Sequence, residues 1–156
     1  MIAGMFIGPA LVFDPATQRC DLAFDGTDLA LDLTPGTTLL VAVGSDRRAH
    51  PDDVLPDVAP PGYAPAALNA RRGYPGDALD ALGRYIGSRL WLLRRRKQTE
   101  ATRRLAESIV AEAVGFFETD LAMPVTLTVR WVVAGMLGIW VKLGAQTMSL
   151  TVPVGG

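Results

Sequence analysis

The residues that most often carry chemistry are few in this chain of 156 residues, which has one histidine and one cysteine. Any Ser-His-Asp or Cys-His arrangement would need His50, but His50 precedes Pro51 in a proline-rich stretch with no nucleophile motif nearby. Asp52, Asp53 and Asp57 lack the glycine and terminal glutamate of a calcium loop, so we interpret them as solvated loop acids. We predict no catalytic, cofactor-binding or metal-ligating residues and expect that the chain is not an enzyme.

The remaining acids do not suggest a glycosidase, which needs two carboxylates about 5 to 10 Å apart across a sugar cleft. Glu107, Glu112 and Glu118 fall on or just after one predicted helix, and the polar face of that helix explains them. The lone Cys20 cannot form an internal disulfide, which is compatible with assembly in a reducing cytoplasm.

Charge is distributed unevenly, although the formal net charge is only −1. Residues 14–57 hold nine acids and three arginines, whereas residues 84–104 hold eight basic residues and one acid. The densest run, 94–97 (Arg-Arg-Arg-Lys), lacks the interleaved aromatic residues and the basic overall balance of a nucleic-acid site. We interpret it as a solvated helix end or as a patch that meets an acidic protein surface, and we predict no nucleic-acid partner.

The N-terminal stretch 1–13 is apolar, but it carries no Lys or Arg and is interrupted by Gly4, Gly8 and Pro9. A secretory signal needs a basic start, and a membrane-spanning helix needs roughly 20 apolar residues. We therefore expect a strand or arm that packs on the protein or on a neighbour, and no membrane partner.

The elements that must position these residues begin with a hairpin over 20–33, because apolar residues alternate on both sides of the turn 25–28. Residues 37–43 form a short apolar run that fits a buried helix or a strand equally well. Residues 46–77 predict an extended loop, since 50–75 contain six of the eleven prolines.

Two longer helices are predicted next. The first covers 78–94, where apolar residues recur at steps of three and four. Those positions are Leu79, Leu82, Ile86, Leu90 and Leu93. Gly83 and Gly87 weaken this helix by about 1 kcal/mol each. The second covers about 99–117 and carries a four-residue ion pair between Arg103 and Glu107.

The C-terminal third predicts an antiparallel β-meander over 123–153, because apolar and polar residues alternate in three runs separated by glycine-containing turns. The last run lies near the chain end and predicts an edge strand. The fold class is therefore α+β, with two helices packed on the meander. We expect a single domain, 1–156, made of an N-terminal arm and hairpin (1–45), a long Pro-rich loop (46–77), helices (78–118) and the meander.

Four stretches in order resemble the Mu-type contractile-tail phage baseplate proteins, a family related to the small baseplate wedge, or sheath-initiator, protein of T-even phages. They are 46–49 (Asp-Arg-Arg-Ala), 52–56 (Asp-Asp-Val-Leu-Pro), 72–77 (Arg-Gly-Tyr-Pro-Gly-Asp), and 87–95 (Gly-Ser-Arg-Leu-Trp-Leu-Leu-Arg-Arg) followed by 97–100 (Lys-Gln-Thr-Glu). The resemblance covers roughly residues 40–143. Tyr74-Pro75 replace two tryptophans usual in the family, and Arg96 replaces an acid, which puts local loop contacts in doubt.

The resemblance implies a structural component of a contractile phage tail baseplate, located in the virion and assembled in the host bacterial cytoplasm. Its partners would be larger baseplate wedge proteins and the tail sheath protein, with central hub or tube proteins as further candidates, in a six-fold arrangement around the tube. It also implies that a β edge is offered to the first sheath ring, which fits the predicted edge strand. Alternatively, Leu150 and Val152 only complete this domain's own sheet.

Arginine, tryptophan and edge-strand residues are the interface candidates. They are Arg72, Arg89, Trp91, Arg94, Arg95, Arg96, Met148, Leu150 and Val152. Trp91 fits core packing as well as an interface, and Arg89 fits a role in fixing the loop that joins the helices. Two other functions stay open: a tail-associated peptidoglycan hydrolase, and a small nucleic-acid-binding protein that uses residues 84–104.

Overall fold

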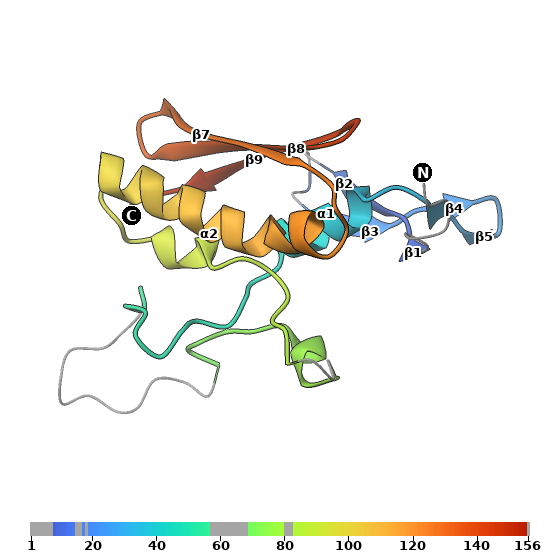
Figure 1. Cartoon of the computed structure of the whole chain (residues 1–156), viewed down its shortest axis with the longest axis horizontal. Coiled ribbons are helices and arrows are strands. Elements are labelled where there is room, and N and C mark those ends of the chain that lie inside the picture. The colour runs from blue at the N-terminus through green and yellow to red at the C-terminus, as the bar shows by residue number, and fades with distance from the viewer. Residues whose placement is uncertain (1–7, 15–16, 18, 57–68, 80–82, 156) are drawn as a thin grey trace.

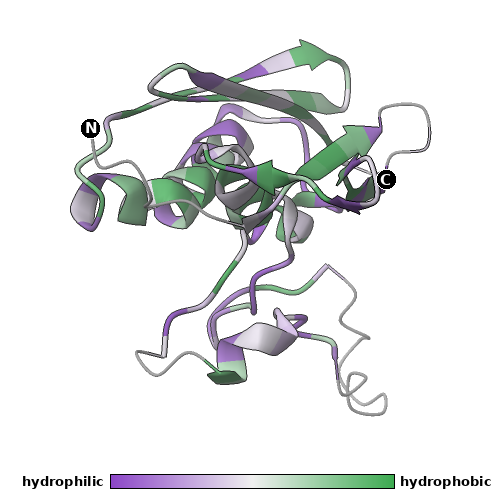
Figure 2. Cartoon of the chain, turned by 90° about the vertical axis from the view of Figure 1, so that its right-hand side faces the viewer, coloured by the Kyte–Doolittle hydropathy of each residue, from purple (hydrophilic) through white to green (hydrophobic). Residues whose placement is uncertain are grey.

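The computed structural model describes residues 8–14, 17, 19–56, 69–79 and 83–155. Residues 1–7 of the predicted N-terminal strand or arm, together with Asp57 and Leu82, lie outside these residues. Figure 1 shows a three-stranded sheet over the helix α2 (Glu100–Thr119), with an arm of short strands at one end. The described residues of the long loop lie on the side of α2 that faces away from the sheet (Figures 1 and 2).

The sheet consists of β7 (Val125–Val133), β8 (Met136–Leu143) and β9 (Gln146–Pro153), paired antiparallel in that order. Gly135 (φ 72°) and Gly144 (φ 60°) adopt the positive φ that the tight turns between the strands require. The three strands alternate between the core face and the exposed face, with β8 the most buried. The predicted meander is confirmed, and β9 forms one edge of this sheet.

The helix α2 begins where the sequence predicts, because Thr99 caps it: the Thr102 N–H donates to Thr99 Oγ1 at 3.2 Å. Its apolar face packs under the sheet and includes the fully buried Val110 and Phe117. The predicted ion pair also forms, since Arg103 Nη1 lies 3.1 Å from Glu107 Oε2. The same nitrogen donates to a β7 carbonyl, Val129 O, at 3.1 Å, which ties the helix to the sheet.

The short apolar run is a helix, α1 (Gly36–Gly44), and it packs against α2 and β9. Leu39 and Val43 on its buried face join the core. Its first turn is held by Asp32, whose Oδ2 accepts from the Thr37 N–H at 2.7 Å. Burial acts to raise the pKa of Asp32, but hydrogen bonds from Thr34 and Thr37 outweigh it and lower the pKa to about 2.

The prediction of a helix over 78–94 is wrong for the described residues of that range. Two short 3-10 helices are present instead, η1 (Pro75–Leu79) and η2 (Leu90–Leu93), and residues 83–89 before η2 are not helical. Gly83 (φ 65°) and Gly87 (φ 100°) adopt positive φ, which an α-helix does not tolerate. Two α-helices do pack with the meander, but the first is α1 and not residues 78–94.

The arm, which we define as the described residues of 8–33, consists of three short antiparallel pairs. They are β1 (Gly8–Pro9) with β6 (Leu31–Asp32), β2 (Leu11–Asp14) with β3 (Arg19–Leu22), and β4 (Phe24–Asp25) with β5 (Asp28–Leu29). The predicted turn forms, with Gly26 at φ 65°. Beyond it the hairpin opens, and a cycle of hydrogen bonds joins all three pairs, with Ala10 N donating to Ala30 O, Ala30 N to Ala23 O, and Ala23 N to Ala10 O.

Candidate protein interfaces

Two of the motif stretches, 46–49 and 87–95, meet at the end of α1, where Gly87 and Ser88 lie against residues 43–47. Ser88 N–H donates to Ser45 O at 2.8 Å, and Ser88 Oγ donates to Val43 O at 2.7 Å. Arg47 N–H returns a bond to Ser88 O at 2.9 Å. A Cβ at position 87 would lie 2.5 Å from Ser45 O, so only glycine allows the two backbones to approach this closely.

Arg89 lies at the centre of an ion-pair network beside this junction. Its Nη1 donates to both carboxylate oxygens of Asp53, at 2.9 and 2.8 Å, and its Nη2 donates to Glu112 Oε2 at 2.6 Å. Arg47 reaches the other Glu112 oxygen at 3.2 Å. The Arg89 side chain is 18% exposed and that of Glu112 is 34% exposed, so this partly buried network joins Asp53 of the long loop, the junction and α2.

The electrostatics of this network favour the charged forms. Burial acts to raise the pKa of Asp53, but hydrogen bonds from Arg89 and from the His50 amide outweigh it, so the pKa lies below its ordinary value. Burial acts to lower the pKa of Arg89, and its two carboxylate partners raise it instead. The expectation that Asp53 is a solvated loop acid is therefore wrong, whereas Asp52 and His50 are exposed as predicted.

Trp91 anchors the other side of the loop. Its indole Nε1 donates to Arg47 O at 2.9 Å, and the Arg72 guanidinium lies 4.6 Å from the centre of its ring. Arg72 also pairs with Asp46. Trp91 is only 6% exposed. Three of the interface candidates, Arg72, Arg89 and Trp91, thus hold the motif loops together within the chain, and little of the Trp91 side chain is left for a partner.

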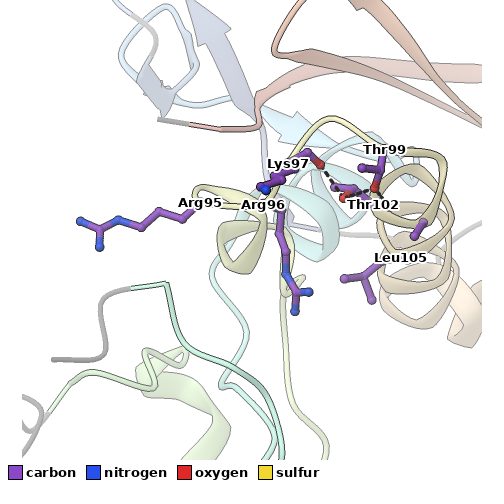
Figure 3. A pocket seen from close by; sticks show the side chains of 7 residues that line it. Arg95, Arg96, Lys97, Thr99, Thr102 and Leu105 are labelled. Atoms are coloured by element: carbon purple, nitrogen blue, oxygen red, sulfur yellow. Dashed lines mark hydrogen bonds between the residues drawn. The ribbon is translucent and has the colours of Figure 1, made fainter. Parts of the chain in front are cut away.

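The basic segment, residues 94–97, is exposed and lies at the opposite side of η2 from this network. Its backbone is fixed, because Gly155 N donates to Arg94 O at 3.1 Å and Thr102 Oγ1 donates to Lys97 O at 2.7 Å. Figure 3 shows the hollow of about 540 Å³ beside it, lined by three of its side chains and the start of α2. Within the described part of the chain, Arg94, Arg96 and Lys97 make no ion pair, so their charge is available to a partner.

The outer edge of β9 is the third candidate surface. Val154 N–H donates to Gly135 O at 2.8 Å at the end of the β8–β9 ladder. Because hydrogen-bonded and non-hydrogen-bonded pairs alternate in an antiparallel ladder, the even-numbered residues of β9 bond to β8. The backbone N–H and C=O groups of Thr147, Ser149 and Thr151 therefore face the free edge, and all three residues are exposed.

The side chains of Met148, Leu150 and Val152 lie on the face of the sheet that packs on the core. Each is half-buried and packs against the main core. As side chains they complete this domain's own sheet, which agrees with the alternative stated for Leu150 and Val152. The groups that remain available to a partner at this edge are the backbone N–H and C=O groups of Thr147, Ser149 and Thr151.

Sequence reasoning missed the partners of Arg89. Asp53 lies 36 residues before it and Glu112 lies 23 residues after it. Glu112 sits on the polar face of α2 as predicted, and no local pattern distinguishes it there from other helix acids. The motif stretches 52–56 and 87–95, which carry the family resemblance, contain Asp53 and Arg89, but nothing in them indicates that these two residues pair.

Among the described residues, no three histidine, cysteine, aspartate or glutamate side chains lie close enough together to hold a metal ion. Neither α-helix of the described chain combines the length and the apolar character that a membrane crossing needs.

Comparison with known proteins identifies the family. Residues 35–149 match the sequence model of the family described as Phage protein GP46, and the chain belongs to that family. A curated relative, "Baseplate protein gp46" of Escherichia phage Mu, is 38% identical over 101 residues. The match covers 65% of this chain and 62% of the Mu protein. No solved structure matches. The resemblance to Mu-type phage baseplate proteins is confirmed, and it begins after the arm.

Proposed function

We propose that this chain is a structural component of a contractile phage tail baseplate, located in the virion tail, and that it starts the tail sheath through the free edge of β9. The observation that carries the baseplate role is the 38% identity to the Mu baseplate protein together with membership of its family. The observation that supports the sheath role is an exposed strand edge with three outward residues. Larger wedge proteins hold the chain around the tube in a six-fold arrangement.

The edge of β9 suits strand addition. Thr147, Ser149 and Thr151 present donors and acceptors in one row, while the half-buried residues between them fix the strand on the core. Pro153 ends the row because it has no N–H. The opposite edge strand, β7, has a register shift between Trp131 and Val133, and a bulge of that kind interrupts pairing. The sheath strand therefore pairs with β9.

Replacing Ser149 with proline tests this role. Ser149→Pro removes one outward N–H and leaves every N–H that pairs with β8 in place. We expect phage carrying Ser149→Pro to assemble baseplate and tube while the sheath fails to start. Electron microscopy of tails, with immunodetection of the altered protein, measures the result. Normally sheathed tails that contain the Ser149→Pro protein would overturn the sheath role.

Two matched variants separate the edge from the fold. Ser149→Ala keeps the backbone donor and should leave sheath assembly unchanged. Leu150→Pro removes an N–H that pairs with β8, so it should lower the thermal unfolding midpoint of the purified protein. Ser149→Pro should not lower it by more than a few degrees, because proline is tolerated on an edge strand where the N–H faces solvent.

The basic segment supports a second contact in the baseplate. Its exposed arginines fit an acidic protein surface, and such a contact weakens as salt rises. Reversing the charge of Arg94 and Arg95 should therefore weaken the binding of this chain to the acidic partner surface in the baseplate, most clearly at low salt. Binding that is the same across an ionic-strength series would reject this contact.

A further inference from the structure

The arm exposes an unusual number of large apolar side chains. Seven of them are between 39% and 69% exposed. They are Val12, Phe13, Leu22, Phe24, Leu29, Leu31 and Leu33. Among the described residues, the buried core cluster begins at Leu39, so these seven side chains lie outside it. A concentration of exposed apolar residues of this kind marks a binding surface.

The arm is also acidic, with five aspartates and one arginine between residues 8 and 33. In its outermost pair Phe24 stands opposite Leu29, and Asp25 stands opposite Asp28. Residues opposite each other in an antiparallel pair share a face, and successive residues alternate between faces. The end of the arm therefore has an apolar face backed by two carboxylates. Figure 2 looks onto this end of the molecule, where green strands lie toward the viewer.

A surface of the opposite kind exists on the same chain. The hollow beside the basic segment has cationic side chains at its rim, Arg95, Arg96 and Lys97. Ala101 and Leu105 of α2 supply apolar lining. In Figure 3, Arg96 and Leu105 project in the same direction, so charge and apolar surface are offered together. The hollow thus complements the arm in both charge and polarity.

We infer that the arm of one copy docks on the basic segment of a second copy, with Phe24 and Leu29 toward the hollow and the arm's aspartates toward the arginines. The inference rests on the proposed function, which already takes the basic segment as a binding surface for an acidic protein surface. It adds that this acidic surface is the arm of another copy of the same chain. The arm and the basic segment lie at opposite ends of the molecule (Figure 1), so one chain cannot satisfy both surfaces by itself. The contact joins copies head to tail, which closes into a ring when the rotation per copy allows it.

Sedimentation velocity of the full-length protein over a range of protein concentrations tests the inference. We expect association that is stronger at about 0.05 M salt than at about 0.5 M, where screening shortens the reach of each charge. Asp21→Lys with Asp25→Lys (the arm variant) should weaken it about tenfold or more, and so should Arg94→Glu with Arg96→Glu (the segment variant). Phe24→Ser should weaken it without changing charge.

An equimolar mixture of the two charge variants gives the decisive result. In each variant the altered surface no longer attracts the unaltered surface on a second copy. In the mixture, the unaltered arm of the segment variant can still dock on the unaltered segment of the arm variant, so association should be regained. Lys142→Glu on the outer sheet face and Asp52→Lys in the loop are exposed controls and should associate like the unaltered protein. Thermal unfolding of each variant should stay close to that of the unaltered protein.

Three outcomes would overturn the inference. The first is a protein that stays monomeric at every concentration and salt level. The second is an arm variant that loses association while the segment variant keeps it, since that pattern indicates an arm-to-arm contact. The third is loss of wedge-protein binding by the segment variant with self-association unchanged, which would assign the basic segment to the wedge proteins. None of these results bears on sheath initiation, which the Ser149→Pro tails test separately.

Discussion

Arg89 links Asp53 of the long loop to Glu112 of α2. Replacing it with methionine keeps the apolar stem but leaves Asp53 and Glu112 without their shared cation. We expect Arg89→Met to lower the free energy of unfolding by about 2 to 3 kcal/mol, because partly buried carboxylates lose charged hydrogen bonds. Urea unfolding measures the difference.

A second arginine provides the matched control. The side chain of Arg104 is 74% exposed, and it reaches only Glu100 on its own helix. Arg104→Met should change the free energy of unfolding by less than about 0.5 kcal/mol. Equal effects of the two substitutions would contradict the special role of Arg89.

Asp53 makes the same network sensitive to pH. Its folded pKa lies below the ordinary value of 3.8, so its contribution to stability is present above that value and is lost as pH falls through the folded pKa. Acidification below about pH 4 should therefore destabilise the unaltered protein more than the Asp53→Asn variant. Parallel pH profiles of the two proteins between neutral and acidic pH would contradict this.

At the scale of the elements, the junction between α1 and the segment before η2 depends on Gly87. Gly87→Ala places a Cβ against the Ser45 carbonyl and forces a side chain into φ 100°, so we expect a loss of about 2 kcal/mol or more. Gly115→Ala is the control within α2, where a Cβ would meet nothing within 4 Å. That variant should gain about 0.5 to 1 kcal/mol. Thermal unfolding of both variants checks the opposite signs.

At the scale of the whole molecule, the arm and the domain are separable. A chain that begins at Thr34 keeps every residue of the described core, so it should unfold cooperatively. It loses the Asp32 bond to α1, at a cost of about 1 kcal/mol. Circular dichroism with thermal unfolding measures the fold, and sedimentation should show that the head-to-tail association is gone. A chain that does not fold without the arm would contradict the separation.

Local pattern predicted the elements whose stability comes from near neighbours. Thr99 and the helical period predicted α2, and strict alternation with turn glycines at 135 and 144 predicted the meander. The same kind of reasoning failed over 78–94, where a regular apolar spacing suggested a helix. Leu79 of that stripe is 87% exposed, while Leu90 and Leu93 are buried in a 3-10 turn. The spacing of apolar residues does not show whether a glycine adopts positive φ. Gly83 and Gly87 both adopt it, and this prevents an α-helix.

The sequence by itself determined the α+β class, the family, the basic segment and the position of the last strand at an edge. Each of these depends on residues close together in the chain or on matched motifs. Only the tertiary structure decided that Arg89 pairs with Asp53 and Glu112, and that Ser149 and not Leu150 faces the free edge. An ion pair between distant segments depends on how the chain folds back, and the direction of an N–H depends on the register of its ladder. Neither the ion pair nor the direction of the N–H can be predicted from the spacing of residues along one strand or one helix.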